Sequence, residues 1–561
     1  MLVTVVLKTD RALAQTPVID ALAAEGVVFD AAMSPVPITL PSHATMLTGL
    51  LPPRHGVRLN TESRLVSSFT TLPELLFAGG YRTGAFIGAS PLDSEGGLDQ
   101  GFEVYDDVTR LPGMRPERSA EKVFAAAREW LLQTGDPEQP VFAFIHLFDP
   151  HWPLEKALPG ADESSYDGEI AYVDRRLGAF LAALPDTERW RDALTVIVSD
   201  HGEGLGEHGE VSHGLLVYEG TLRVPWIVHR PSAFEPRRVA ETVGLVDLAP
   251  TLVELAGMDP LAETDGVSLV PVLRGSKPVE RELYFESLYG YLEFGWARLR
   301  GVRAGALKYT SAPNPELYDL YADPGETVNL YASRSTEAAR LDLRLQAYGD
   351  GSWTRTEADA ERLARLASLG YVSARPAVSD VTARPDPKDK VEIFYRLAAA
   401  IALTDSGRHA EAYPAFESLD GEFDRSPHFY TEFGDAAAGM GRWEDAQRLY
   451  GRVLELDADN LKALENLAVA QLALQAFDEA HANASRLLSI DPNHVNGHYL
   501  VGSVEIWARR ELGSGVGHWR RLLQLDPGHQ KAGQIRRMLG AYDAGERGLA
   551  ELRSRFVGSA P

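Results

Sequence analysis

The chain contains no cysteine at any of its 561 positions. Disulfide bonds, thiolate metal sites and a cysteine nucleophile are therefore excluded, whereas either redox compartment stays open. Apolar runs are shorter than a membrane crossing requires, and the opening "MLVTVVLKTD" lacks the basic start and long apolar core of a signal peptide. We expect no membrane segment and a cytoplasmic location for the chain as written, or a periplasmic or membrane-tethered one if its N-terminus is truncated.

Positive charge is scarce. Lysine and arginine number 55 against 80 aspartate and glutamate residues, a formal net charge of −25. This acidity argues against nucleic acid or an anionic membrane as a partner, although a small cationic or metal-containing pocket could still take an anionic substrate. The hydrophobic and charged fractions, 45% and 24%, are those of ordinary soluble domains, and the length predicts roughly two to four of them.

Short apolar runs alternate with helical patterns over residues 1–370, which predicts an α/β domain with a mainly parallel sheet flanked by helices. The runs are "LVTVVL" from Leu2, "RTGAFIG" from Arg82, "VFAFIHLF" from Val141, "ALTVIVS" from Ala193 and "VPWIVH" from Val224, with late strands expected in "GVRAGALKYT" and "PELYDLYADPGETVNL". Polar clusters follow three runs, at 8–10, 149–151 and 200–201. Because ligands of open α/β sheets bind beyond the carboxyl ends of strands, we expect these clusters to meet in one crevice.

A proline-containing stretch without apolar periodicity, residues 371–390, is predicted to be a linker. Beyond it, residues 391–545 repeat with a period of 34 or 35, as shown by "LELDADN", "LSIDPNH" and "LQLDPGH" and by Ala412, Ala446 and Ala480. That period is typical of helix-turn-helix repeats.

The repeated segment resembles the tetratricopeptide repeat family. Gly434 and Ala468 occupy the small position of the first helix, and Phe416 and Tyr450 an aromatic position of the second. The resemblance implies an all-α solenoid whose groove takes a protein or peptide partner.

Hydroxyls gather before an apolar helical run in "PITLPSHATMLTGLLPPRHG", Pro37 to Gly56. In one interpretation Thr39 caps a helix and Pro41 lies in its first turn. In the other Thr39 is a nucleophile, since a helix N-terminus stabilises negative charge on a hydroxyl or a bound oxyanion. The stretch alone leaves both open.

A buried strand delivers Asp200 and His201 into the glycine-broken loop of "TVIVSDHGEGLGEHGEVSHG". A carboxylate next to an imidazole suits Zn²⁺, Mn²⁺ or Mg²⁺ better than a Ca²⁺ cage. The alternative is a turn in which the aspartate caps the next element. We expect Glu203, Glu207, His208 and Glu210 to lie on a solvated part of this loop.

Residues 1 to about 330 resemble the sulfatase-like branch of the alkaline phosphatase superfamily. Four segments carry the resemblance in order: "TPVIDALAAEGVVFDAAMSPVPITLPSHATMLTG" (Thr16 to Gly49), "HLFDPHWPL" (His146 to Leu154), "VSDHGEGLGEHG" (Val198 to Gly209) and "HGLLVYEGTLRVPWIV" (His213 to Val228). The resemblance implies an alkaline-phosphatase-like fold and a metal-dependent hydrolase or transferase of sulfate or phosphate esters.

Carried over position by position, the resemblance makes Thr39 the nucleophile, where sulfatases have the residue matured into formylglycine. Threonine cannot follow that route, and its place is that of the metal-bound threonine of the phosphodiesterase branches. His43 replaces a supporting arginine, Asp200 and His201 match the paired ligands of one divalent ion (Mn, Zn, Mg or Ca), and His151 and His213 match contacts to ester oxygens.

The first strand departs from the family pattern. Lys8 stands where an acidic metal ligand is usual, so Asp10 is the candidate replacement carboxylate. A lysine next to Asp200 would repel a divalent cation. Two functions therefore stay open: a metal-dependent ester hydrolase, and a catalytically impaired sulfatase-like domain that serves as the base of a repeat scaffold.

Overall fold

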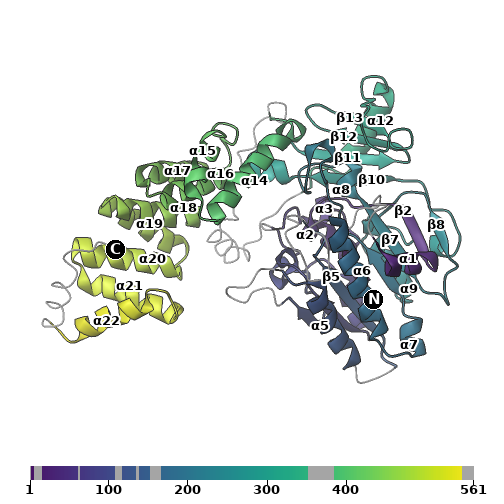
Figure 1. Cartoon of the computed structure of the whole chain (residues 1–561), viewed down its shortest axis with the longest axis horizontal. Helices are drawn as coiled ribbons and strands as arrows, with labels where there is room; N and C mark the ends of the chain where they lie inside the picture. The colour runs from purple at the N-terminus through teal and green to yellow at the C-terminus, as the bar shows by residue number, and fades with distance from the viewer. Residues whose placement is uncertain are drawn as a thin grey trace. The chain divides into compact units, whose positions relative to one another are not determined.

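The computed structural model describes residues 2–5, 15–60, 63–107, 117–133, 138–151, 166–351 and 384–545, with only the backbone given for residues 2–5. The described chain divides into two compact units. The first holds residues up to 292 together with 296–351 and 384–392, and the second holds 293–295 and 393–545. Figure 1 colours both by position along the chain. No helix in the described ranges is long and apolar enough to cross a membrane.

A nine-stranded sheet forms the centre of the first unit, in the order β4-β3-β5-β1-β6-β7-β2-β8, with β9 beside β2. The strands are β1 (Leu2–Val5), β2 (Val27–Met33), β3 (Arg82–Phe86), β4 (Val104–Asp106), β5 (Val141–Leu147), β6 (Thr195–Val198), β7 (Arg223–His229), β8 (Arg237–Val239) and β9 (Val243–Gly244). All five predicted runs form strands. Only β7 runs antiparallel to its neighbours, β6 and β2, so the mainly parallel α/β sheet is confirmed.

Helices cover both faces of this sheet, and the alternation of side chains along β5 shows why. Phe142 and Phe144 join the core on the side of α2 (Thr39–Thr48), α4 (Leu72–Ala78) and α9 (Leu248–Leu255). Ala143 and Ile145 join the core on the side of α1 (Pro17–Ala24), α5 (Ala120–Leu132) and α6 (Tyr166–Ala182). A strand buried on both faces reads as a continuous apolar run, which is why β5 was visible in the sequence. Shorter helices complete the unit: α3 (Pro52–His55), α7 (Glu188–Arg191), α8 (Glu219–Leu222), α10 (Val270–Leu273) and the first four residues of α11 (Tyr289–Phe294).

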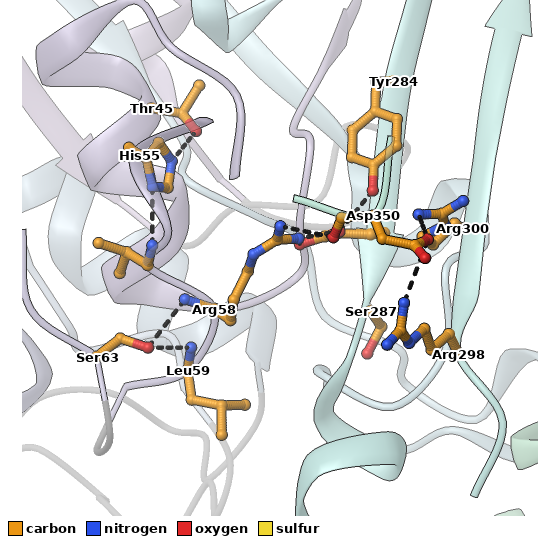
Figure 2. A network of polar contacts seen from close by, with 12 residues as sticks. Thr45, His55, Arg58, Leu59, Ser63, Tyr284, Ser287, Arg298, Arg300 and Asp350 are labelled. Atoms are coloured by element: carbon orange, nitrogen blue, oxygen red, sulfur yellow. Dashed lines mark hydrogen bonds and ion pairs between the residues drawn. The ribbon is translucent and has the colours of Figure 1, made fainter. Parts of the chain in front are cut away.

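A smaller antiparallel sheet follows, made of β10 (Glu282–Ser287), β11 (Leu299–Ala304), β12 (Leu307–Ser311) and β13 (Glu316–Asp319), and α12 (Ser335–Gln346) packs on it. The late strands expected from the sequence are β11 to β13. Polar contacts tie this sheet to the chain after α3: Arg58 reaches Glu286 on β10, and the Tyr284 hydroxyl donates to Glu286 Oε2 at 2.5 Å. Figure 2 shows Arg58 and Tyr284 on the two sides of this contact. Residues 384–390 of the predicted linker also pack in this unit, since Asp386 accepts from the Asn314 N–H at 3.0 Å, while 371–383 lie outside the described residues.

The second unit consists of helices that pack in chain order. They are α14 (Val391–Asp405), α15 (His409–Glu417), α16 (Pro427–Gly439), α17 (Trp443–Leu456), α18 (Leu461–Ala473), α19 (Phe477–Ile490), α20 (Val495–Val504), α21 (Leu512–Leu525) and α22 (Ala532–Asp543), with a π-helical turn at Glu505–Arg509. A Cβ at Gly434 would lie 2.5 Å from the Tyr450 ring, so the small position predicted in α16 is required by the aromatic one in α17. The all-α repeat architecture is confirmed.

Candidate active site

Thr39 is the first residue of α2, and its side chain is 2% exposed. The N-cap is Ile38 in an extended conformation, and no side chain caps from that position. The interpretation of Thr39 as the cap is therefore wrong, because the helix already includes Thr39 and so starts one residue earlier than a helix capped by Thr39 would. Instead, Asn60 Oδ1 accepts from the Leu40 N–H at 2.8 Å, and the Thr39 hydroxyl lies 3.3 Å from His201 Nε2.

Asp200 and His201 follow the carboxyl end of β6 and are fully buried. The His201 Nδ1–H donates to the Gly202 carbonyl at 3.0 Å, which leaves Nε2 as an acceptor directed at the Thr39 hydroxyl. Burial lowers the pKa of His201 to about 4 against the attraction of Asp200. The imidazole is therefore neutral at pH 7, with its Nε2 lone pair available to a proton or a metal ion.

The Asp200 carboxylate has both oxygens buried with no hydrogen-bond partner among the described residues. Its Oδ2 lies 3.3 Å from His201 Nε2 and 3.6 Å from His43 Nδ1. Burial acts to raise the pKa of this carboxyl, but the imidazoles around it, His201 first, hold it below the ordinary value. A buried carboxylate without hydrogen bonds is costly unless a cation meets it.

This donor set fits part of a divalent metal site. Asp200 and His201 offer a carboxylate and an imidazole, and the Thr39 hydroxyl is an oxygen donor within reach of His201. Within the described ranges, no group of three His, Cys, Asp or Glu side chains is assembled for a metal ion. Lys8 and Asp10, the remaining candidates from the sequence, lie outside the described residues.

His43 lies one turn into α2 with no exposed surface. Its Nδ1–H donates to the Thr39 carbonyl at 2.8 Å. Burial lowers its pKa, although the nearby Asp200 opposes the change. His43 therefore braces the backbone that carries Thr39 and faces Asp200.

His146, at the end of β5, was missed by sequence reasoning. Its ring lies 5.2 Å from that of His43, its Nε2 is buried without a hydrogen-bond partner in the described chain, and burial lowers its pKa to about 3. The sequence signal that could have identified His146 is a polar residue near the carboxyl end of the apolar run "VFAFIHLF".

His213 and His151 complete the group of imidazoles. The His213 ring centroid lies 4.1 Å from that of His201 and 4.9 Å from that of His151. His213 Nδ1 contacts Glu203 Oε1 at 3.2 Å, and although burial opposes it, Glu203 helps to raise the pKa of His213. The His151 ring stacks on that of Phe148 with centroids 4.0 Å apart, and the His151 backbone N–H donates to Glu169 Oε2 at 3.4 Å. Thr39, His43, His151, Asp200, His201 and His213 are thus brought together.

The expectation of a solvated loop is half wrong. Glu207 and His208 are exposed as expected, but Glu203 is 0% and Glu210 2% exposed. The loop folds back on itself, with the Gly204 N–H on the Ser212 carbonyl at 2.7 Å and Glu210 accepting from the N–H groups of Leu215 and Leu216. Burial raises the pKa of Glu210 to about 7. The glycine-rich composition of the loop gave no sign in the sequence that it folds into a compact turn with buried carboxylates.

Comparison with known proteins covers both units. A sulfatase family model matches residues 9–258, a model described as N-sulphoglucosamine sulphohydrolase, C-terminal, matches 206–348, and a tetratricopeptide repeat model matches 437–503. A Δ4,5-hexuronate-2-O-sulfatase of Bacteroides thetaiotaomicron is 26% identical over 421 residues, which covers 62% of this chain and 85% of the relative.

Two solved structures share the fold of the first unit. One, determined in complex with its substrate D-glucosamine-2-N,6-O-disulfate, has a TM-score of 0.54 and 20% identity, covering 62% of this chain and 97% of its own. The other, a phosphonate monoester hydrolase of Agrobacterium radiobacter, has a TM-score of 0.50 and 22% identity, covering 62% and 95%. At these identities the likeness is one of fold.

Proposed function

This chain carries a sulfatase-family domain followed by tetratricopeptide repeats, and we propose that it hydrolyses sulfate esters with Thr39 as the nucleophile. The observation that carries the proposal is the buried Thr39 hydroxyl 3.3 Å from the Nε2 acceptor of His201, next to an Asp200 carboxylate whose two oxygens have no hydrogen-bond partner in the described chain. Burying the Thr39 hydroxyl, the His201 imidazole and the Asp200 carboxylate together costs folding free energy. Their chemistry suits nucleophilic attack on an anionic ester.

A divalent ion is part of this proposal. Asp200, His201 and Thr39 would hold it, with Asp10 as a further candidate outside the described residues. When bound, such an ion lowers the pKa of the hydroxyl and offsets charge on the ester group. Its identity among Mn, Zn, Mg and Ca is left to experiment.

The chain's own residues then divide the remaining work. The Thr39 oxygen attacks the sulfur in line as the bond to the alcohol oxygen breaks, and water then hydrolyses the sulfated threonine. Because the single lone pair of His201, on Nε2, would be committed to the ion, the Thr39 hydroxyl would lose its proton to water rather than to His201. His151 and His213 are placed to donate to ester oxygens, and His43 holds the Thr39 backbone.

The helical repeats are proposed to bind a protein or peptide partner, as their architecture provides an extended surface of stacked helix pairs. The repeats and the candidate active site lie in separate units.

A panel of chromogenic esters tests the proposal. The full chain is loaded in turn with each of the four ions and assayed with 4-nitrophenyl sulfate, bis(4-nitrophenyl) phosphate and 4-nitrophenyl phenylphosphonate. We expect the sulfate ester to be turned over at the highest rate. A preference for either phosphorus ester would correct the proposed substrate class. No turnover of any ester with any ion would refute the proposal that the chain is an ester hydrolase.

A further inference from the structure

Glu203 is a fully buried carboxylate whose place in the molecule is tightly fixed. It lies between Gly202 and Gly204, and a Cβ at either glycine would come within 2.3 Å of backbone oxygen. Its Oε1 contacts His213 Nδ1 at 3.2 Å, and its Oε2 is buried without a hydrogen-bond partner among the described residues. Burying a carboxylate in this way costs stability, so a function is needed to explain it.

His213, in contrast, lies on a loop. Apart from Glu203, its Nδ1 has the Ser212 hydroxyl at 3.5 Å, too long for a strong hydrogen bond. Gly214, the next residue, has a φ of +102°, so the backbone here is not held by a helix or strand. The carboxylate of Glu203 is therefore the group that restrains the imidazole.

We propose that Glu203 is the positioning residue of His213, accepting its Nδ1–H and so directing Nε2 toward the group formed by Thr39, Asp200 and His201. This inference rests on the proposed function, in which His213 Nε2 meets an ester oxygen. A carboxylate behind an imidazole fixes both its tautomer and its orientation, as in other sites where an imidazole acts on a substrate. Because the whole Glu203 side chain is buried, its carboxylate cannot turn away from His213 into solvent.

Nitrogen NMR of the imidazoles tests the geometry without any activity. Histidine labelled with ¹⁵N is incorporated into the full chain, and the His213 signals are assigned by their loss in His213→Asn. We expect the parent protein to show a protonated Nδ1 in both the neutral and the charged imidazole, with Nε2 also protonated in the charged form that can donate to an ester oxygen. Glu203→Gln and Glu203→Ala should shift His213 toward a mixture of tautomers. The exposed Glu207 on the same loop supplies the matched control, Glu207→Gln, which should leave the signals in place. Unchanged His213 signals in both Glu203 variants would overturn the inference.

A double-mutant cycle tests the consequence for turnover. Glu203→Ala should lower kcat by about 10- to 100-fold with little change in KM, and adding it to His213→Ala should cost nothing more. Glu203→Gln should recover part of the loss, because its amide oxygen can still accept the Nδ1–H. Additive losses would overturn the inference. If the parent chain turns over no ester, the proposed function fails, and the NMR result alone decides whether Glu203 orients His213.

Discussion

Thr39 is the first residue of α2, but its hydroxyl does not cap the helix. As the first residue of α2 it lies where the helix dipole favours negative charge, and its hydroxyl is shared with His201 rather than with the helix backbone. A hydroxyl that capped the helix would be committed to an N–H group. Because Asn60 takes that task at Leu40, the Thr39 hydroxyl is not committed to the helix backbone.

Replacing Thr39 by alanine should therefore abolish turnover without unfolding the protein. The change removes the hydroxyl and one hydrogen bond, worth about 1 kcal/mol of unfolding free energy. Ester turnover should fall by at least about a thousandfold, as when other nucleophiles are removed. Steady-state rates and a denaturant titration measure the two effects.

The same helix offers a control. Thr45 is also buried, and its hydroxyl contacts His55 Nε2 at 3.0 Å, away from His201 (Figure 2). Thr45→Ala should cost a similar amount of stability and leave turnover intact. Full activity in Thr39→Ala would show that another residue attacks the ester.

At the scale of elements, a buried ion pair joins the segment after α3 to β10 of the smaller sheet. Arg58 and Glu286 have side chains only 1% exposed, and Arg58 contacts both carboxylate oxygens (Figure 2). Removing one partner leaves a buried charge uncompensated, which costs about 3–5 kcal/mol. We therefore expect Glu286→Gln to lower the free energy of unfolding by that amount, measured by denaturant titration.

Asp350 provides the comparison for this prediction. It pairs with Arg300 at 2.7 Å, but its side chain is 73% exposed, so Asp350→Asn should cost less than about 1 kcal/mol. The double variant Arg58→Met/Glu286→Met should be more stable than Glu286→Gln, because no charge is left buried. Equal losses of unfolding free energy in Glu286→Gln and Asp350→Asn would show that burial adds nothing to the contribution of the Arg58–Glu286 pair.

In the second unit, α20 and α21 meet at two histidines whose rings are within hydrogen-bond distance of each other. His498 Nδ1 lies 2.9 Å from His518 Nδ1, and the His498 Nε2–H donates to the Pro492 carbonyl at 3.0 Å. Burial lowers both pKa values below the ordinary 6.5. Arg521 lowers that of His498 further while Asp491 opposes it, and Glu505 and His481 act in opposite directions on His518.

The unfolded chain therefore binds more protons than the folded one just below pH 6.5, and the free energy of opening these helices falls as the pH drops. Hydrogen exchange in α20 and α21, corrected for the intrinsic pH effect, should accelerate between pH 7.5 and 5.5. His518→Gln should weaken that response. Equal acceleration in the parent and in His518→Gln would rule out the pair as its source.

At the scale of the whole molecule, metal content separates the two functions that the sequence left open. A chain of net charge −25 attracts cations loosely at many places, so only ions that survive dialysis are informative. If the sulfatase-family unit is an enzyme, protein purified without chelators should carry about one divalent ion per chain, and chelation should remove turnover. Elemental analysis for Mn, Zn, Mg and Ca measures this. Absence of all four, with no turnover, would favour a scaffold, and Lys8 would be the first residue to replace.

The sequence by itself determined the elements and their order. Buried strands appear as apolar runs, and a 34-residue period requires stacked helix pairs, because both signals come from contacts close along the chain. The polar residues after β5 and β6 could also be expected to converge, since neighbouring parallel strands end at one edge. The short strands β8 and β9 and the reversed direction of β7 left no such local signal.

Only the tertiary structure decided which side chains of the site are buried and what each one faces. Glu203 and Glu207 lie in one glycine-rich loop and look alike in sequence, yet one is fully buried against His213 and the other is exposed. Asn60 reaches the start of α2 from 20 residues away, and Thr39 meets His201 from 162 residues away in the sequence. Burial and direction depend on contacts between distant segments, and a single sequence specifies those contacts only through the folded chain.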